Sequence, residues 1–147
     1  MTSLTNYGQQ VALLDDNRSI LGGLTGSASG AGGLANLIAT LRLFNTSSTP
    51  GKNAGTSTWT TPAGGGYSNK VISKANWTGS LNGSDYQIVL ANQTFTATGG
   101  SIDNVDGAFV GDNAATPNVI AWWERSSSIT LAVNDAITAD TLTVRIV

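Results

Sequence analysis

The chain has 147 residues, of which only 11% are charged, with a net charge of −2 and neither histidine nor cysteine. This length allows one domain with a hydrophobic core. The missing residue types exclude the commonest general base, the Ser-His-Asp triad, disulfides, and thiolate or imidazole metal sites. A slightly acidic chain also lacks the positive field that nucleic-acid binding needs, so we expect no nucleic-acid partner.

The N-terminal segment is the one part with a helical period. Leu4, Tyr7, Val11 and Leu14 recur at a 3-4-3 spacing and would line one face of a short helix. Such a helix is marginal in isolation, so we expect it to dock on its own domain or on a neighbouring subunit. The chain does not begin with basic residues followed by an apolar run, so no signal peptide is expected. No segment approaches the ~20 apolar residues that cross a bilayer. Neither export nor membrane insertion is expected.

Composition divides the chain into an arm (1–21), a linker (22–36) and a domain (37–147). Glycine and serine dominate 22–33, which is typical of a flexible linker. From residue 37 to 44 apolar side chains alternate, which marks the start of β structure. The next stretch, 45–66, is rich in Thr, Ser, Gly and Pro. A loop of this length in a compact domain is either functional or ordered by a partner.

The rest of the chain carries short alternating segments separated by Gly, Asn and Asp. This punctuation predicts an all-β fold, an antiparallel β-sandwich or a jelly-roll-like barrel, with the short N-terminal helical arm attached. In the last segment Leu142, Val144 and Ile146 share one face, which we expect to be buried. The expected strands cover 37–44, 67–77, 85–91, 93–99, 104–111, 118–124, 128–133 and 141–147.

Two adjacent tryptophans, Trp122 and Trp123, lie in one expected strand. Neighbouring side chains of a strand point to opposite faces, so the two indoles cannot share a pocket. If one enters the core, the other exposes up to ~200 Å² of mostly apolar surface unless something covers it. Another subunit is one candidate cover, and the 45–66 loop folding back is the other. Trp59, in that loop, and Tyr67 are further candidate contact residues.

Catalytic and ligand sites have weaker support. Asp103 with Asp106, or Asp112 with Glu124, would suit glycosidase chemistry if their carboxylates lay about 5 to 10 Å apart. The segment from Asp103 to Gly107 fails the calcium-loop spacing, because Val105 occupies a ligand position. The sequence therefore predicts no cofactor and no metal, although a weak loop site stays open.

Aromatic side chains suggest one further alternative. Trp59, Trp77 and Tyr67, with Asn and Thr nearby, would suit a carbohydrate-binding platform. The competing interpretation is that they serve as core residues or interface anchors, since a sandwich of this size has few other large apolar side chains.

Several segments together resemble a family of small virion proteins of tailed bacteriophages, described as head-decoration or tail-fibre-like proteins. They include L-x-L-F at Leu41–Phe44 and G-G-G-Y at Gly64–Tyr67, and the others are LTNYGQQVALL, SNKVISKANW, GSIDNVDGAFVGD and SITLAVNDAITADTLTVRIV. The chain departs from the family pattern in its glycine-rich segment and at Asn134-Asp135, where relatives commonly carry Gly-Asp. The resemblance implies a non-enzymatic structural protein.

The leading hypothesis is a capsid decoration, or cement, protein on the outer surface of a virion. Its expected partners are the major capsid protein and further copies of itself. The eight expected contact residues are Leu4, Tyr7, Val11, Leu14, Trp59, Tyr67, Trp122 and Trp123. A tail or tail-fibre component, a carbohydrate-binding module for host attachment and a carboxylate hydrolase are the alternatives.

Overall fold

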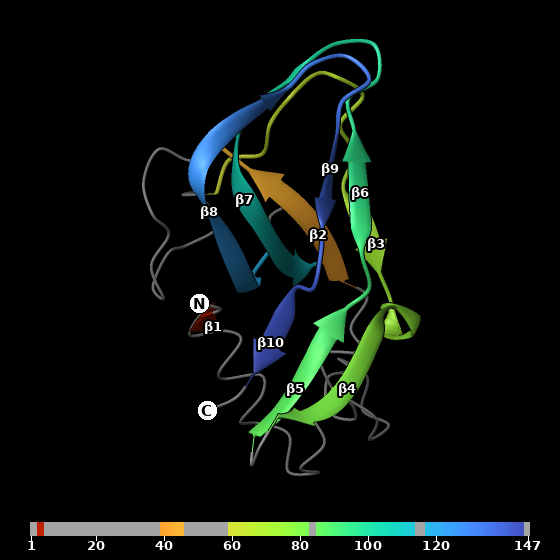
Figure 1. Cartoon of the computed structure of the whole chain (residues 1–147), viewed down its shortest axis with the longest axis vertical. Coiled ribbons are helices and arrows are strands. Elements are labelled where there is room, and N and C mark those ends of the chain that lie inside the picture. The colour runs from red at the N-terminus through yellow and green to blue at the C-terminus, as the bar shows by residue number, and fades with distance from the viewer. Residues whose placement is uncertain (1–2, 5–38, 46–58, 83–84, 114–116, 146–147) are drawn as a thin grey trace.

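The computed structural model of the chain describes residues 3–4, 39–45, 59–82, 85–113 and 117–145, which form a nearly all-β fold (Figure 1). Every strand pairing in it is antiparallel, so the predicted fold class is confirmed. Within these residues no helix is long and apolar enough to cross a membrane. The strands are β1 (Ser3–Leu4), β2 (Ala39–Phe44), β3 (Lys70–Ile72), β4 (Trp77–Asn82), β5 (Asp85–Leu90), β6 (Gln93–Thr96), β7 (Ile102–Asp112), β8 (Val119–Leu131), β9 (Ala136–Ala139) and β10 (Thr143–Arg145).

The described residues test only part of the predicted N-terminal helix. Leu4 lies in strand β1, not in a helix, so the prediction that the helix includes it is wrong. Pairing with β8 gives Ser3 and Leu4 backbone partners within the folded domain, whereas a helix this short is only marginally stable on its own. Tyr7, Val11 and Leu14, together with the 22–36 linker, lie outside the described residues.

One layer of the sandwich is a five-stranded sheet in the order β1-β8-β7-β2-β3. The sequence predicted two strands at 118–124 and 128–133, but they form the single strand β8. The polar run between them resembles a turn. It stays extended because β8 continues to pair with β7, with Val105 opposite Ile129 and Ile102 opposite Leu131. Irregularities in this register bend the hairpin over the second layer (Figure 1).

The second layer consists of a three-stranded sheet, β10-β5-β4, and a two-stranded sheet, β6-β9. Val89 pairs with Thr143 and Gln93 pairs with Ala139, so the register is the same in both sheets. The backbone N–H of Leu90 also donates to the carbonyl of Leu142 at 2.8 Å. The two sheets are therefore segments of one long ribbon. Strand β9, which the sequence did not predict, completes it.

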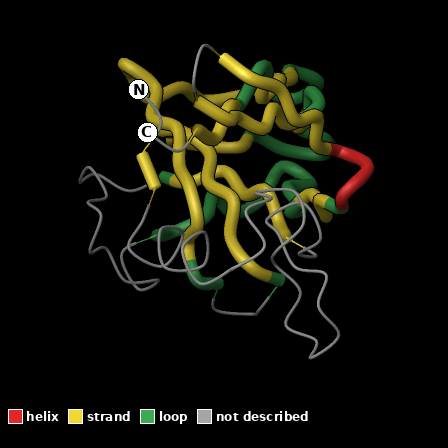
Figure 2. The backbone as a smooth tube through the Cα atoms, turned by 90° about the horizontal axis from the view of Figure 1, so that it is seen from below, coloured by secondary structure: helices red, strands yellow, loops and turns green. Residues whose placement is uncertain are grey.

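The chain crosses between the layers at the short 3-10 helix η3 (Lys74–Asn76), at one edge of the molecule (Figure 2). Its Asn76 side chain accepts hydrogen bonds from the Ser73 backbone N–H at 2.9 Å and from the Ser73 hydroxyl at 3.1 Å. These local bonds compete with strand pairing and end β3 early. The expected 67–77 strand is accordingly divided into β3, η3 and the start of β4.

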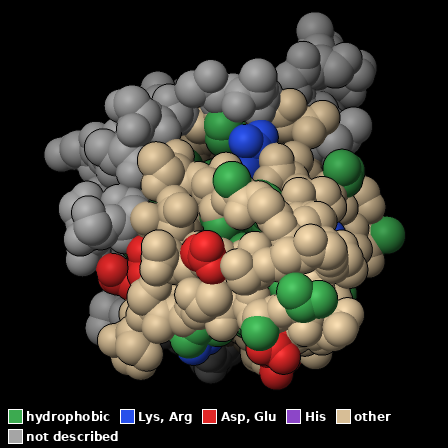
Figure 3. Space-filling model, turned by 90° about the horizontal axis from the view of Figure 1, so that it is seen from above, with side chains coloured by type: hydrophobic (Ala, Val, Ile, Leu, Met, Phe, Trp, Pro, Cys, Tyr) green, Lys and Arg blue, Asp and Glu red, His purple; other side chains and the backbone are tan. Residues whose placement is uncertain are grey.

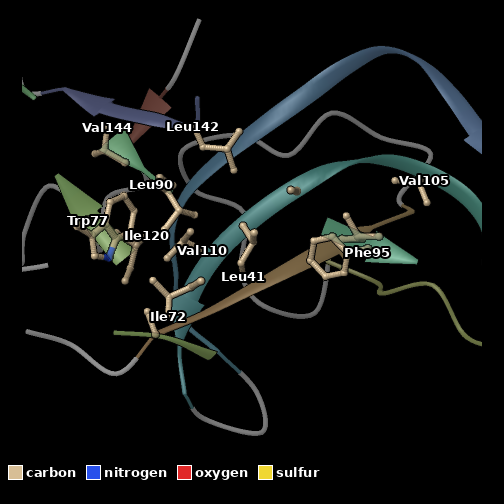
Figure 4. Packing of buried hydrophobic residues seen from close by; sticks show 14 of the residues in the cluster. Leu41, Ile72, Trp77, Leu90, Phe95, Val105, Val110, Ile120, Leu142 and Val144 are labelled. Atoms are coloured by element: carbon tan, nitrogen blue, oxygen red, sulfur yellow. The ribbon is translucent and has the colours of Figure 1, made fainter. Parts of the chain in front are cut away.

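The main core fills the space between the two layers (Figure 4). Leu142 and Val144 are buried there, which confirms the face predicted for them, whereas Ile146 lies outside the described residues. The fully or nearly fully buried members with large side chains include Leu41, Leu43, Ile72, Ile88, Leu90, Phe95, Ile102, Val105, Val110 and Ile120.

Three consecutive glycines, Gly64 to Gly66, form a turn that only glycine adopts easily. Their φ angles are +82°, +57° and +69°. The turn lies against the end of β6, where the N–H of Thr98 donates to the carbonyl of Gly65 at 2.6 Å. A Cβ on Gly66 would lie 2.8 Å from the Thr98 carbonyl oxygen and would overlap its hydroxyl. This turn sets the position of Tyr67, the next residue.

Candidate contact surfaces

A second hydrophobic cluster lies on the face of the five-stranded sheet opposite the main core. It comprises Phe44, Trp59, Phe109, Val119 and Trp122. The ring of Trp59 lies 5.0 Å from Phe44, 5.0 Å from Phe109 and 5.8 Å from Trp122, measured between centroids. Edge and tilted geometries of this kind are favourable for aromatic pairs. The part of the outer face that these residues occupy is therefore packed within the chain.

A bulge in β8 decides which residues face that cluster. Val110 pairs with Ala121 and the next residue, Gly111, pairs with Val119, so Ile120 is the extra residue of β8. Ile120 and Ala121 consequently both enter the main core, while Val119 and Trp122 face outward.

Trp122 is covered by residues of its own chain. Trp122 is 8% exposed and Trp59, which lies over it, is 7% exposed, so neither indole presents a surface to another molecule. Trp123, on the opposite face, is half-buried and packs against the main core. Of the two candidate covers, the structure therefore favours the loop, and the outward indole needs no second polypeptide for shelter. The end of the 45–66 loop folds back and supplies the shelter.

Hydrogen bonds fix this return of the loop. The backbone N–H of Asn45 donates to the carbonyl of Thr60 at 2.9 Å, and the Thr60 hydroxyl donates to the Asn45 side-chain oxygen at 2.5 Å. They join the end of β2 to the residue after Trp59. Gly107 leaves room for the Phe44 ring against β7, because a Cβ at this position would lie only 2.6 Å from that ring.

Tyr67 is bonded within the fold. Its hydroxyl accepts from the backbone N–H of Leu43 at 2.9 Å and donates to the Asn69 side-chain oxygen at 3.0 Å. Its ring stacks on Phe95 of the second layer, with centroids 5.9 Å apart. Burial raises the pKa of Tyr67 to about 12. Tyr67 thus links the two layers, and its expected role as a contact residue stays a prediction.

Trp59 and Trp77 do not form the accessible aromatic platform that the carbohydrate-binding alternative requires. Trp59 and Trp77 are each 7% exposed and belong to different clusters on opposite sides of the first sheet. A sugar ring needs an accessible aromatic face, which neither residue offers. The Nε1–H groups of Trp59, Trp77 and Trp123 are buried and have no hydrogen-bond partner among the described residues. The contacts described for these indoles are packing contacts.

The carboxylates do not gather into a metal site in the described part of the chain, which contains no group of three His, Cys, Asp or Glu side chains suited to an ion. Glu124 lies opposite Gly107, while Asp112 is five residues further along β7, so their backbones are roughly 16 Å apart. The proposed Asp112–Glu124 pair is therefore wrong. Asp112 instead accepts from Asn118 at 3.1 and 2.7 Å and closes the β7–β8 hairpin.

In the described part of the chain, β1 and β3 form the two edges of the five-stranded sheet. On one side β1 pairs with β8, placing Ser3 opposite Trp122 and Leu4 opposite Ala121. On the other side β3 consists of Lys70 to Ile72. Edge strands carry backbone groups that another chain can pair with. No pattern in the sequence indicated the β1 pairing, because the helical spacing of the same residues dominated.

Val71 of β3 is the most exposed large hydrophobic residue described, at 64%, and Val133, in the turn after β8, follows at 53%. Alternation along Lys70-Val71-Ile72 explains the exposure, because Ile72 enters the core and Val71 faces away from it. On the face seen in Figure 3, hydrophobic side chains form small separate groups among other side chains and backbone, with few charged side chains between them. The edges are the best candidates for contact with other chains.

Comparison with known proteins gives no family for the chain: no protein-family model, no curated protein and no solved structure matches it.

Proposed function

We propose that the chain is a structural, non-enzymatic component of a virion, a decoration protein that binds the outer surface of the capsid shell and associates with copies of itself. The observation that carries this proposal is the contrast between the outer-face cluster, which the chain covers with its own Trp59, and the edge strand β3, where Val71 is the most exposed large hydrophobic residue described. A protein that covers its large aromatic side chains itself and exposes a hydrophobic side chain on an edge strand is suited to joining chains there, because edge strands carry backbone groups that another chain can pair with.

The segments that resemble phage virion proteins form parts of this frame. L-x-L-F is the end of β2, G-G-G-Y is the turn that positions Tyr67, and GSIDNVDGAFVGD contains β7. The resemblance therefore concerns structural elements, which is consistent with a structural role. The major capsid protein is the proposed partner, with no nucleic acid and no membrane involved.

Copy number tests the proposal. Virus particles would be purified from the cells that produce them, and quantitative mass spectrometry would measure the copy number of this chain relative to that of the shell protein. The proposal predicts a number of copies comparable with that of the shell subunits. A few copies per particle would instead support the tail or tail-fibre alternative. Complete absence from purified particles would refute both.

A further inference from the structure

In strand β2 the backbone groups of every second residue point towards the edge strand β3. The N–H of Leu43 shows the direction, because it donates to the hydroxyl of Tyr67 at 2.9 Å, and Tyr67 lies just before β3 in the chain. Successive residues of a strand direct their N–H and C=O groups to alternate sides. The backbone groups of Leu41 and Ala39 therefore also face β3.

Val71 of β3 consequently points its own backbone N–H and C=O away from the sheet. Lys70 pairs with Leu41 and Ile72 pairs with Ala39, so these are the pairs whose backbone groups face each other. Val71 lies between them and faces the other way, and no strand lies beyond β3 in the described part of the chain. Its side chain is 64% exposed. One residue thus offers a donor, an acceptor and an apolar side chain at the edge.

The neighbours of Val71 restrict what can pair with this edge. The backbone N–H of Ser73 already donates to the Asn76 side-chain oxygen at 2.9 Å. The ammonium group of Lys70 lies over the Phe95 ring of the second layer, 5.5 Å from its centroid, so this charge is directed away from the face on which Val71 lies. An outward lysine commonly prevents edge strands from pairing, and the Lys70 side chain is not placed to do so.

We infer that Val71 is the centre of a two-fold contact in which β3 pairs antiparallel with β3 of a second copy. On this axis Val71 lies opposite Val71 of the second copy, so the two residues exchange both backbone hydrogen bonds and their side chains cover each other. Lys70 then lies opposite Ile72 of the second copy. The inference rests on the self-association in the proposed function and names the residue at which two copies meet.

The register at Val71 is favoured over the other two-fold registers within β3. An axis at Lys70 would place two ammonium groups side by side, and like charges directly opposite each other are destabilising. An axis at Ile72 would require the N–H of Ser73, which already donates to Asn76. The axis at Val71 avoids both problems and brings two exposed apolar side chains together. The edge is therefore complementary to a second copy of itself.

The contact is small, so it should be weak between free molecules. Two hydrogen bonds and one pair of valines do not offset the cost of bringing two free molecules together, whereas copies held side by side on a shell meet at a much higher effective concentration. A covalent trap detects a contact of this kind.

Because the sequence has no cysteine, one introduced thiol can trap the contact. Val71→Cys would be oxidised and its dimer measured by non-reducing electrophoresis, with Val133→Cys, another exposed valine, as the matched control. Opposite residues of a hydrogen-bonded pair have Cα atoms about 5.5 Å apart, which is within disulfide range. The Val71→Cys dimer should form at least about tenfold faster, because pairing raises the local thiol concentration. Equal rates would overturn the inference.

A mixture of two variants tests the register. With the axis at Val71, Asn69 of one copy lies opposite Ser73 of the other, and both side chains are exposed. Chains carrying Asn69→Cys and Ser73→Cys should therefore give several-fold more mixed dimer than the two same-variant dimers together. Random collisions give about equal amounts of the two kinds, and that result would contradict the register.

Val71→Pro removes the outward N–H without removing a bond to β2. Introduced into the Asn69→Cys and Ser73→Cys chains, it should leave them folded, as judged by circular dichroism, and reduce the mixed dimer to the random value. Val71→Lys should have the same effect, because it places two like charges on the axis. Undiminished mixed dimer in either folded variant would refute the pairing. These measurements use isolated protein, so trapping without incorporation into virus particles would remove the proposed function alone, and incorporation without trapping would remove the inference alone.

Discussion

Trp59→Ala should lower the free energy of unfolding by about 3 kcal/mol, because Trp59 is the cover of the outer-face cluster. Replacing a buried Trp by Ala costs about 3 to 5 kcal/mol in a typical core. Trp59 is 7% exposed and contacts three aromatic rings, so it belongs in that range. Its indole N–H has no partner among the described residues, which lowers the expected loss, since removing a buried unsatisfied donor recovers about 1 kcal/mol or more.

Urea unfolding followed by circular dichroism measures this loss. With a slope of about 2 kcal/mol per molar urea, the midpoint should fall by roughly 1.5 M without a change of slope. Trp59→Phe is the matched control: it keeps a ring and removes the N–H, so we expect a change within about 1 kcal/mol. Acrylamide should also quench tryptophan fluorescence more strongly in Trp59→Ala, because Trp122 loses its cover. A loss below about 1 kcal/mol for Trp59→Ala would refute the sheltering of Trp122 by its own chain.

Three other substitutions, and Gly99→Ala as a control for the first, probe separate parts of the fold. Gly66→Ala should destabilise the fold by about 3 kcal/mol or prevent folding, because the residue has a positive φ and its new Cβ would overlap Thr98. Gly99→Ala has a similar φ but open space around the Cβ, so it should cost about 1 kcal/mol. Thermal unfolding of the two variants measures the difference. Tyr67→Phe should cost about 1 to 2 kcal/mol, because it leaves the buried N–H of Leu43 without an acceptor, and unchanged stability would contradict this. Since burial raises the pKa of Tyr67 to about 12, its contribution to stability is complete below pH 10 and is lost as the pH rises towards 12; urea midpoints of the native chain and Tyr67→Phe should converge over that interval. Val71→Thr should change stability by less than about 0.5 kcal/mol, since this exposed edge residue packs against little, and a large loss would show that β3 is covered.

The strands that alternation predicts well are those with one buried and one partly exposed face. In β6 the alternation of Thr94, Phe95 and Thr96 matches the observed exposure, with Phe95 buried and both threonines exposed. The same rule placed Leu142 and Val144 in the core. In these cases the side-chain period alone decides which face is buried, so the sequence is sufficient to predict the buried residues.

Long-range pairing accounts for what the sequence did not predict. The polar run after Glu124 reads as a turn locally, yet pairing with β7 holds it in one long strand. Strand β1 forms only because β8 offers an edge to two residues whose own spacing favours a helix. Tertiary contacts override local preference at both places.

Strand stereochemistry predicted the faces of the two tryptophans but not the segment that covers the outward one. Adjacent positions on β8 required that Trp122 and Trp123 face opposite sides, and they do. Stereochemistry did not specify which segment covers the outward indole. That answer depends on the return of the loop to place Trp59 beside Phe44, a contact that the sequence pattern does not encode.

A cryo-electron microscopy map of the assembled particle, detailed enough to separate strands, would show which surfaces of this protein meet other chains. We expect neighbouring chains to meet it at the edges formed by β3 and by β8 with β1. We also expect the cluster of Trp59 and Trp122 to remain enclosed within one chain. Contacts made through the ribbon of β6 and β9, with both edges of the five-stranded sheet facing solvent, would contradict the proposed use of the edges.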